Sequence, residues 1–253
     1  MVTKDNKEAL IKLLAMITMV IDHLGIRWFS NGRIFRLIGR ISFPIYAWYT
    51  ARSVYYTAQK HTEVKHALRM FVLAVISEIP YDLFFSSTVY NPKRNNVIFT
   101  LLIGYLVCLG IHRYRFLILR VLIVIAGVFL AEGFFCSYGF IGIMLVFAFD
   151  RLQSSEHVRN SIPLRLFWIT VIITIYSMYY IVLGAEPMAR EQIWHTFLTY
   201  SYSQLGAFLS IPLLMLDAKS KRRLPYAFKW VYRLFYPIHL ITILLLESYF
   251  LII

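Results

Sequence analysis

An aspartate and a histidine stand side by side in an otherwise apolar stretch, LLAMITMVIDHLGI, near the start of the chain. A buried imidazole whose second nitrogen meets a carboxylate or carbonyl is a general base with a fixed tautomer. Adjacent residues on a helix point about 100° apart, so Asp22 and His23 are each expected to find a partner on another helix. Because ionisable residues in a membrane span are costly, we favour a catalytic function for His23 over a structural clamp between helices.

Three arginines follow in RWFSNGRIFRLIGRISFP. Arg33, Arg36 and Arg40 are spaced three and four residues apart, which places them on one stripe of a helix. Arg33 can extend to the lipid headgroups. Arg40 is expected about a turn and a half inside a helix over 34–59, where a guanidinium needs a carboxylate, a backbone carbonyl or an anionic ligand.

Further polar residues gather at helix ends on the side of the membrane where the first helix ends. Glu78 and Asp82 come near the end of one predicted helix, and Asn96 opens the next. This concentration suggests a polar cavity that opens outward, although single polar residues at helix ends often contact headgroups. The other residues expected on this side are Asn95, Thr100, Glu132, Tyr138 and Glu186.

A second histidine lies near the middle of the last predicted helix, in RLFYPIHLITILLL. His239 follows Pro237, which removes a backbone donor and can kink the helix. This histidine is the alternative candidate for the general base, and Tyr236 is a candidate hydrogen-bond donor.

The composition places these residues in a membrane. Of the 253 residues, 59% are hydrophobic and 15% are charged, and the mean hydropathy is +0.64. Soluble domains carry about a quarter charged residues. Continuous apolar stretches of roughly 18 to 25 residues indicate transmembrane helices, whereas barrel strands would alternate. The predicted fold is an all-α polytopic transmembrane helix bundle.

About nine helices are expected, within one domain over residues 1–253. The longest connection, about 184–200, could contain a short interfacial helix. The predicted helices span 9–27, 34–59, 64–86, 96–113, 115–131, 137–152, 162–184, 201–217 and 228–252.

The distribution of charge predicts the orientation. Most of the 26 lysines and arginines fall in the N-terminus and in every second connection, with a strong cluster in DAKSKRRLPYAFKW. Cytoplasmic segments carry this excess, so the N-terminus is expected inside and the C-terminus outside. The net charge of +13 then reflects orientation and contact with anionic lipid, and nucleic-acid binding is not expected. Cys108 and Cys136 form no metal or disulfide pattern, so no metal is predicted.

An ordered set of motifs covers residues 12 to 240: KLLAMITMVIDHLG, RLIGRISFPIYAW, ISEIPYDLF, NVIFTLLIG, SYGFIGIML and YRLFYPIHL. This set resembles the TraX family, named for the conjugation protein associated with acetylation of pilin. It resembles more distantly the multi-span acyltransferases that include heparan-α-glucosaminide N-acetyltransferase. The family commonly has an aspartate before the Tyr-Gly of the sixth helix. This chain departs from that pattern, because its acid is Glu132, six residues before Tyr138.

The resemblance implies a bacterial cytoplasmic-membrane enzyme that transfers an acyl group, with acetyl-CoA as co-substrate, to a hydroxyl or amine acceptor in or across the membrane. It gives His23 the role of general base, with Asp22 orienting the base or the acceptor and His239 as the alternative base. The residues expected to bind substrate or co-substrate are Arg36, Arg40, Glu78, Asp82, Asn96 and Tyr236.

Three questions stay open at this point. The chain has no glycine-rich nucleotide loop, so the phosphates of acyl-CoA are expected near cytosolic residues such as Lys12 or Lys65, and the pantetheine arm must reach an outward-lying base. The acceptor is a protein, a glycan or a small molecule. Intramembrane acids, arginines and histidines also build transporters, so a proton-coupled or anion-binding transporter is the alternative function, and a scaffold without chemistry is a third.

Overall fold

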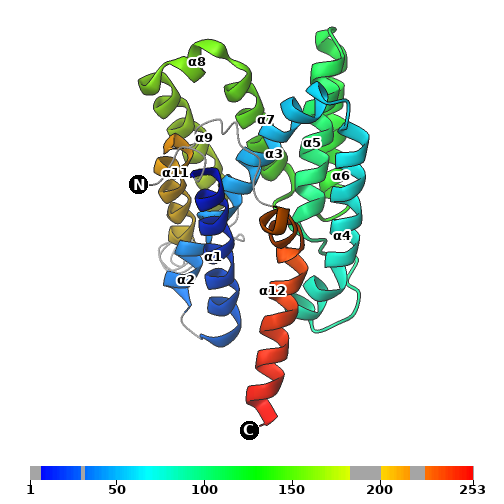
Figure 1. The fold of residues 1–253 in the computed structure, drawn as a ribbon, viewed down its shortest axis with the longest axis vertical. Coiled ribbons are helices and arrows are strands. Elements are labelled where there is room, and N and C mark those ends of the chain that lie inside the picture. The colour runs from blue at the N-terminus through cyan, green and yellow to red at the C-terminus, as the bar shows by residue number, and fades with distance from the viewer. Residues whose placement is uncertain (1–6, 30–31, 183–200, 217–225, 253) are drawn as a thin grey trace. The chain divides into compact units, whose positions relative to one another are not determined.

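The computed structural model describes residues 7–29, 32–182, 201–216 and 226–252 (Figure 1). Within these ranges all regular structure is helical, apart from an isolated bridge between Asn95 and Cys136. The prediction of an all-α fold is therefore confirmed. Glu186 and the interfacial helix expected over 184–200 lie outside the described residues.

Three of the described helical segments are long and apolar enough to cross a membrane: Lys7–Trp28, Ile162–Tyr180 and Val231–Tyr249. Two shorter segments, Val97–Arg113 and Ser203–Leu216, are apolar as well. These lengths and compositions support the assignment of the chain to a membrane.

The chain divides into two compact units. Unit 1 comprises Met1–Tyr46 and Ser155–Lys229, and unit 2 comprises Ala47–Ser154 and Trp230–Ile253. Two of the three boundaries, after Tyr46 and after Lys229, fall inside helices, and the third falls between two helices.

Unit 1 is built around a short helix that packs tightly against its neighbours. Helix α2 contacts both α1 and the 3₁₀ helix η2. Glycines permit this approach, because a Cβ on Gly39 would overlap Asp22 and a Cβ on Gly206 would overlap the carbonyl of Leu37. The elements of unit 1 are α1 (Lys7–Trp28), α2 (Arg33–Gly39), α8 (Glu156–Asn160), α9 (Ile162–Val182), η2 (Ser201–Leu209) and α11 (Ser210–Leu216).

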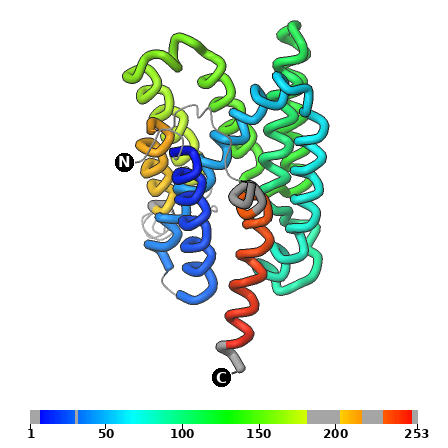
Figure 2. The backbone as a smooth tube through the Cα atoms, viewed as in Figure 1, coloured from blue at the N-terminus to red at the C-terminus, as the bar shows by residue number. Residues whose placement is uncertain are grey.

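In unit 2, helix α5 contacts α4, α6 and α7, and Figure 2 shows the four running side by side. Its interior face is almost wholly apolar, and Leu101, Val107 and Ile111 are buried in it. The elements are most of α3 (Ser42–Gln59), α4 (Glu63–Ser86), α5 (Val97–Arg113), α6 (Leu117–Gly133), α7 (Gly139–Ser154) and most of α12 (Tyr226–Ile252).

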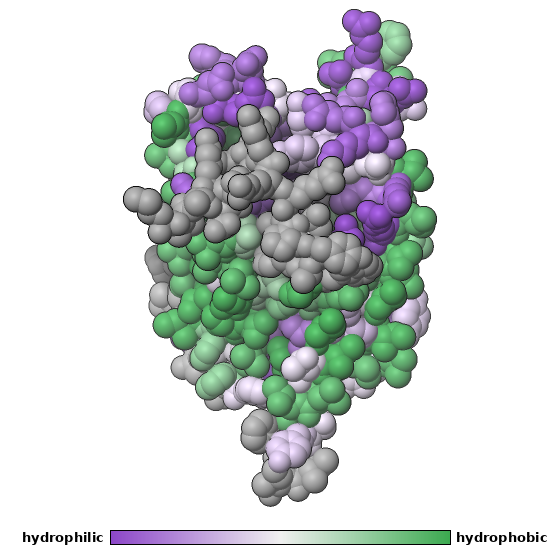
Figure 3. Space-filling model, in the orientation of Figure 1, coloured by the Kyte–Doolittle hydropathy of each residue, from purple (hydrophilic) through white to green (hydrophobic). Residues whose placement is uncertain are grey.

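The surface of unit 2 fits the membrane interpretation. Figure 3 shows apolar side chains along α4 and hydrophilic ones where α5 ends and α6 begins. An apolar helix surface is suited to contact with lipid chains. The exposed apolar residues of α4 are Val64, Leu68, Phe71, Val72, Val75, Ile76, Ile79 and Leu83.

Two of the predicted helices are interrupted. The helix expected over 34–59 is broken after Gly39, where the Oγ atom of Ser42 donates to the Gly39 carbonyl at 2.8 Å, and α3 begins at Ser42. Arg40 therefore lies at the break, and the expectation that it lies inside a continuous helix was wrong. The helix expected over 201–217 begins as η2 and becomes α-helical only at Ser210, so Pro212 falls in a first α-turn, where proline is tolerated.

Candidate functional site

In unit 1, Asp22 of α1 pairs with an arginine of α2. The Nη1 atom of Arg36 donates to Oδ2 of Asp22 at 3.3 Å, and the charge of Arg40 also acts on this carboxylate. The close approach requires Gly39, whose position leaves no room for a Cβ beside Asp22. The carboxylate therefore finds its partner on another helix, as the sequence predicts.

The other oxygen of Asp22 is not matched in the same way. The side chain is 14% exposed, yet Oδ1 is buried and accepts no hydrogen bond from any described residue. A buried carboxylate oxygen without a donor costs about 1–3 kcal/mol or more. A ligand that donates an O–H or N–H group to Oδ1 would remove this cost.

His23 follows on the same helix and is buried, together with Met16 and Met19 of its own stripe. Arg40 is buried in the same unit. Unit 1 therefore contains the candidate base His23, an acid with an unmatched oxygen and a buried cation. Lys12, which was one of the residues expected near the CoA phosphates, has its Nζ atom 2.7 Å from a carboxylate oxygen of Glu8.

In unit 2, Asn96 joins the start of α5 to α4. Its Oδ1 atom accepts from the backbone N–H of Ile98 at 2.9 Å and so caps the helix. Its Nδ2 atom donates to the carbonyl of Ala74 at 2.8 Å and to Oε2 of Glu78. Asn96 is fully buried, so these bonds fix the position of the Glu78 carboxylate.

Asp82 lies one turn after Glu78 on α4 and is also fully buried. Its Oδ2 atom accepts from the backbone N–H of Asn91 at 2.7 Å. Oε1 of Glu78 and Oδ1 of Asp82 are buried and accept no hydrogen bond within the described part of the chain. The three predicted acids, Asp22 included, thus share one arrangement: one oxygen of each is held, and the other has no donor in the part of the chain that the structure describes.

A hydrogen-bonded network that sequence reasoning missed lies in unit 2, around Tyr81, the neighbour of Asp82 on α4. Nε of Arg94 donates to the hydroxyl of Tyr81 at 2.9 Å. That hydroxyl lies 2.6 Å from Oγ of Ser137, which itself donates to the Asn95 carbonyl at 2.9 Å. The only sequence signal was indirect, because Tyr81 and Ser137 fall inside motifs selected for their neighbours.

Two candidates lie on α12 in the same unit. The hydroxyl of Tyr236 lies at the backbone amide of Val97 and within electrostatic reach of Glu78. Nδ1 of His239 is 2.8 Å from the carbonyl of Phe235. A neutral ring must donate from Nδ1 to this carbonyl, so the lone pair is on Nε2. His239 therefore meets the chemical requirement for a base with a fixed tautomer.

The predicted site residues fall into two sets, one in each unit. The structure brings an acid and two arginines together in unit 1, and it brings a carboxylate, an amide and a tyrosine together in unit 2. The first set is Asp22, His23, Arg36 and Arg40, and the second is Glu78, Asp82, Asn96, Tyr236 and His239.

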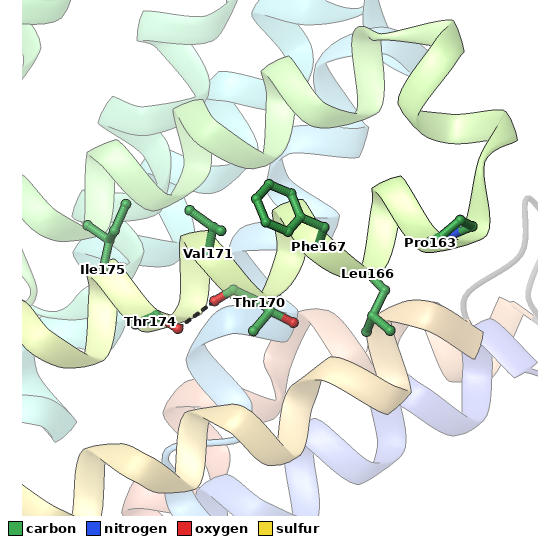
Figure 4. Close-up of a pocket in the computed structure, with 7 residues that line it drawn as sticks. All are labelled: Pro163, Leu166, Phe167, Thr170, Val171, Thr174 and Ile175. Carbon is green, nitrogen blue, oxygen red and sulfur yellow. Dashed lines mark hydrogen bonds between the residues drawn. The ribbon is translucent and has the colours of Figure 1, made fainter.

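Other features of the described residues do not coincide with these sets. An apolar hollow of about 490 Å³ runs along α9 and is lined by that helix alone (Figure 4). The hydroxyl of Thr174 in the hollow already donates to the Thr170 carbonyl at 2.8 Å, so the hollow is poorly suited to polar chemistry. Among the described residues, no group of three histidine, cysteine or acidic side chains could hold a metal ion.

Comparison with known proteins gives one match over most of the chain. The family model described as TraX protein matches residues 7–247. A short segment is similar to the uncharacterized protein RP591 of Rickettsia prowazekii (strain Madrid E), with 38% identity over 52 residues. That match covers 21% of this chain and 21% of the relative, so the chain spans about a fifth of the length of this relative. No solved structure matches the chain.

Proposed function

Because the chain belongs to the TraX family, we propose that it is a membrane acyltransferase. It would transfer an acetyl or other acyl group from cytosolic acyl-CoA to a hydroxyl or amine acceptor in or across the bacterial cytoplasmic membrane. The proposal includes about nine membrane spans, with the N-terminus inside and the C-terminus outside. The observation that carries it is the buried His23, which follows Asp22, an acid whose Oδ1 atom has no donor among the described residues.

The chemistry needs a base and a group that stabilises negative charge. A thioester is already activated, so the enzyme must take the proton from the acceptor and stabilise an oxyanion. In the proposed reaction His23 takes this proton as the acceptor oxygen or nitrogen attacks the thioester carbonyl. The carbon–sulfur bond then breaks, and the thiolate of CoA receives the proton from His23.

The contacts of Arg36 and Arg40 suggest a different role for each in the proposed reaction. Arg36 is 3.3 Å from the Asp22 carboxylate, so we assign it to holding this acid in place. Arg40, which is buried at the break between α2 and α3, is the candidate for stabilising the oxyanion or another anionic group. Asp22 then presents Oδ1 to the acceptor.

The residues of unit 2 are proposed, as the sequence predicts, to bind substrate or co-substrate. Glu78 and Asp82 each present an oxygen without a donor among the described residues, which suits a ligand that donates hydrogen bonds. Asn96 holds Glu78 in position, and Tyr236 adds a hydroxyl near the same carboxylate. His239 is the alternative base, since its Nδ1 contact with the Phe235 carbonyl fixes its tautomer.

A transporter is the second candidate function, and the same unmatched carboxylate oxygens favour it, because buried acids also bind protons and cations. The two functions differ in their need for acyl-CoA. The purified chain should release free CoA from acetyl-CoA only when an acceptor fraction from membranes is supplied. The chain reconstituted in sealed vesicles should not move solutes when acyl-CoA is absent. Solute flux without acyl-CoA, together with no release of CoA, would replace the acyltransferase by the transporter.

A further inference from the structure

At the hydrophilic end of unit 2, a buried acid holds two exposed side chains. Nε2 of His112 on α5 lies 3.0 Å from both carboxylate oxygens of Asp150 on α7. Nε of Arg151 donates to Oδ2 of Asp150 at 3.0 Å, and Nη2 of Arg151 is 2.9 Å from Nε2 of His112. The Asp150 side chain is 5% exposed, whereas those of His112 and Arg151 are 41% and 38% exposed.

The adjoining turn between α5 and α6 adds further positive charge. Arg113 and Arg115 are exposed, and neither forms an ion pair with any residue in the described ranges. Arg120 follows on α6, and its Nε atom donates to the carbonyl of Tyr114 at 2.8 Å. Asp150 therefore neutralises only one of several guanidinium groups at this end of the unit.

We propose that this surface, which we call the α5–α7 basic surface (His112, Arg113, Arg115 and Arg151), binds phosphate groups. The planar fork of arginine matches phosphate oxygens in a bidentate manner. Asp150 holds Arg151 in a set orientation, so less side-chain freedom is lost on binding. Lys12 is 13% exposed and contacts Glu8, so it is a poorer phosphate site than the exposed Arg113 and Arg115.

Phosphate groups reach such a surface from two sources, the nucleotide end of acyl-CoA and the headgroups of anionic lipids. The first source rests on the proposed acyltransferase function and would give the chain its co-substrate site on the cytosolic side. The second is independent of that function.

The test uses the full chain purified in neutral detergent or in lipid nanodiscs. Equilibrium binding is measured for CoA and for pantetheine, which carries the same thiol arm without phosphates. Retention of phosphatidylglycerol against phosphatidylcholine is measured by native mass spectrometry. The variants are Arg151→Gln and the double change Arg113→Gln with Arg115→Gln. The control is Arg159→Gln, which removes one positive charge from α8, where Arg159 is 3.7 Å from Glu156.

The surface variants are expected to bind CoA at least about tenfold more weakly, to bind pantetheine like the parent and to keep the parent's thermal unfolding midpoint. Arg159→Gln should bind CoA within about twofold of the parent. If the variants instead lose phosphatidylglycerol while CoA binding is unchanged, the phosphate comes from lipid. If both CoA binding and lipid retention are unchanged in folded variants, the proposal is wrong. If the parent binds no CoA, the acyltransferase function fails and lipid retention alone decides this proposal.

Discussion

Replacing Asn96 with alanine removes the contacts that join α4 to the start of α5. The side chain caps α5 at Ile98 and donates to the Ala74 carbonyl and to Glu78. A lost N-cap costs about 0.5–2 kcal/mol, and each buried acceptor left without its donor costs about 1–3 kcal/mol. Since Asn96 is fully buried, water cannot easily replace these bonds. Oε2 of Glu78 keeps the backbone N–H of residue 96 at 3.3 Å, so the main losses are the cap and the bond to the Ala74 carbonyl. We expect the free energy of unfolding to fall by about 1.5–5 kcal/mol.

Asn96→Asp separates the two parts of this effect. An aspartate keeps the oxygen that caps α5 but loses the amide donor and places a second carboxylate against Glu78. At neutral pH it should therefore destabilise the chain at least as much as alanine does. Protonation of either carboxyl removes the repulsion and restores a donor, so the loss should shrink as the pH falls.

The assay is denaturant unfolding of the purified variants in mixed micelles. Asn95→Ala is the matched control. Among the described residues, the side chain of Asn95 makes a single hydrogen bond, to the Phe134 carbonyl, so this variant should lose only about 1 kcal/mol. The reasoning is refuted if Asn96→Ala loses no more stability than Asn95→Ala, or if Asn96→Asp shows no dependence on pH.

Two further predictions concern unit 1 and the orientation. Gly39→Ala should separate α2 from Asp22, because the new Cβ would overlap that side chain, and the rate of acyl transfer should fall at least about tenfold. The control Gly133→Ala, with no atom within 4 Å of the added Cβ, should transfer at the parent rate. Equal rates for the two variants would contradict the described packing. In intact cells, Ser220→Cys should be protected from an impermeant thiol reagent, and Ala189→Cys should react with it. Cys108 and Cys136 are both buried, so they should give little background. The reverse pattern would overturn the orientation, and equal labelling would overturn the odd number of spans.

Local signals in the sequence were enough to predict the approximate positions of the long helices and some contacts between them. The apolar stretches gave the helices to within a few residues, and Asn96 was recognised where it caps α5. The rule that neighbours on a helix point apart predicted a partner for Asp22 on another helix, which is Arg36. These features depend on residues close in sequence or on general helix geometry.

The remaining features depend on packing between distant segments. The break at Arg40 is an exception, because Pro44 has no N–H to donate to the Arg40 carbonyl, which is a local signal of a helix boundary. The contact of Tyr81 with Ser137 joins α4 to the turn before α7, and that of His112 with Asp150 joins the ends of α5 and α7. Each residue of these pairs is unremarkable among its own neighbours, and only the fold brings the partners together.

The most direct test of the proposed acyltransferase is the rate of CoA release by His23→Ala in the presence of acceptor, measured beside acyl-CoA binding and beside His239→Ala. General-base catalysis contributes about 10²–10⁴ in rate. His23→Ala should therefore lose at least about a hundredfold in rate while acyl-CoA binding is retained, and His239→Ala should stay active. If His23→Ala transfers at the parent rate and His239→Ala is inactive, the base lies on α12. If both variants transfer at the parent rate, neither histidine is the base and the proposed mechanism is wrong.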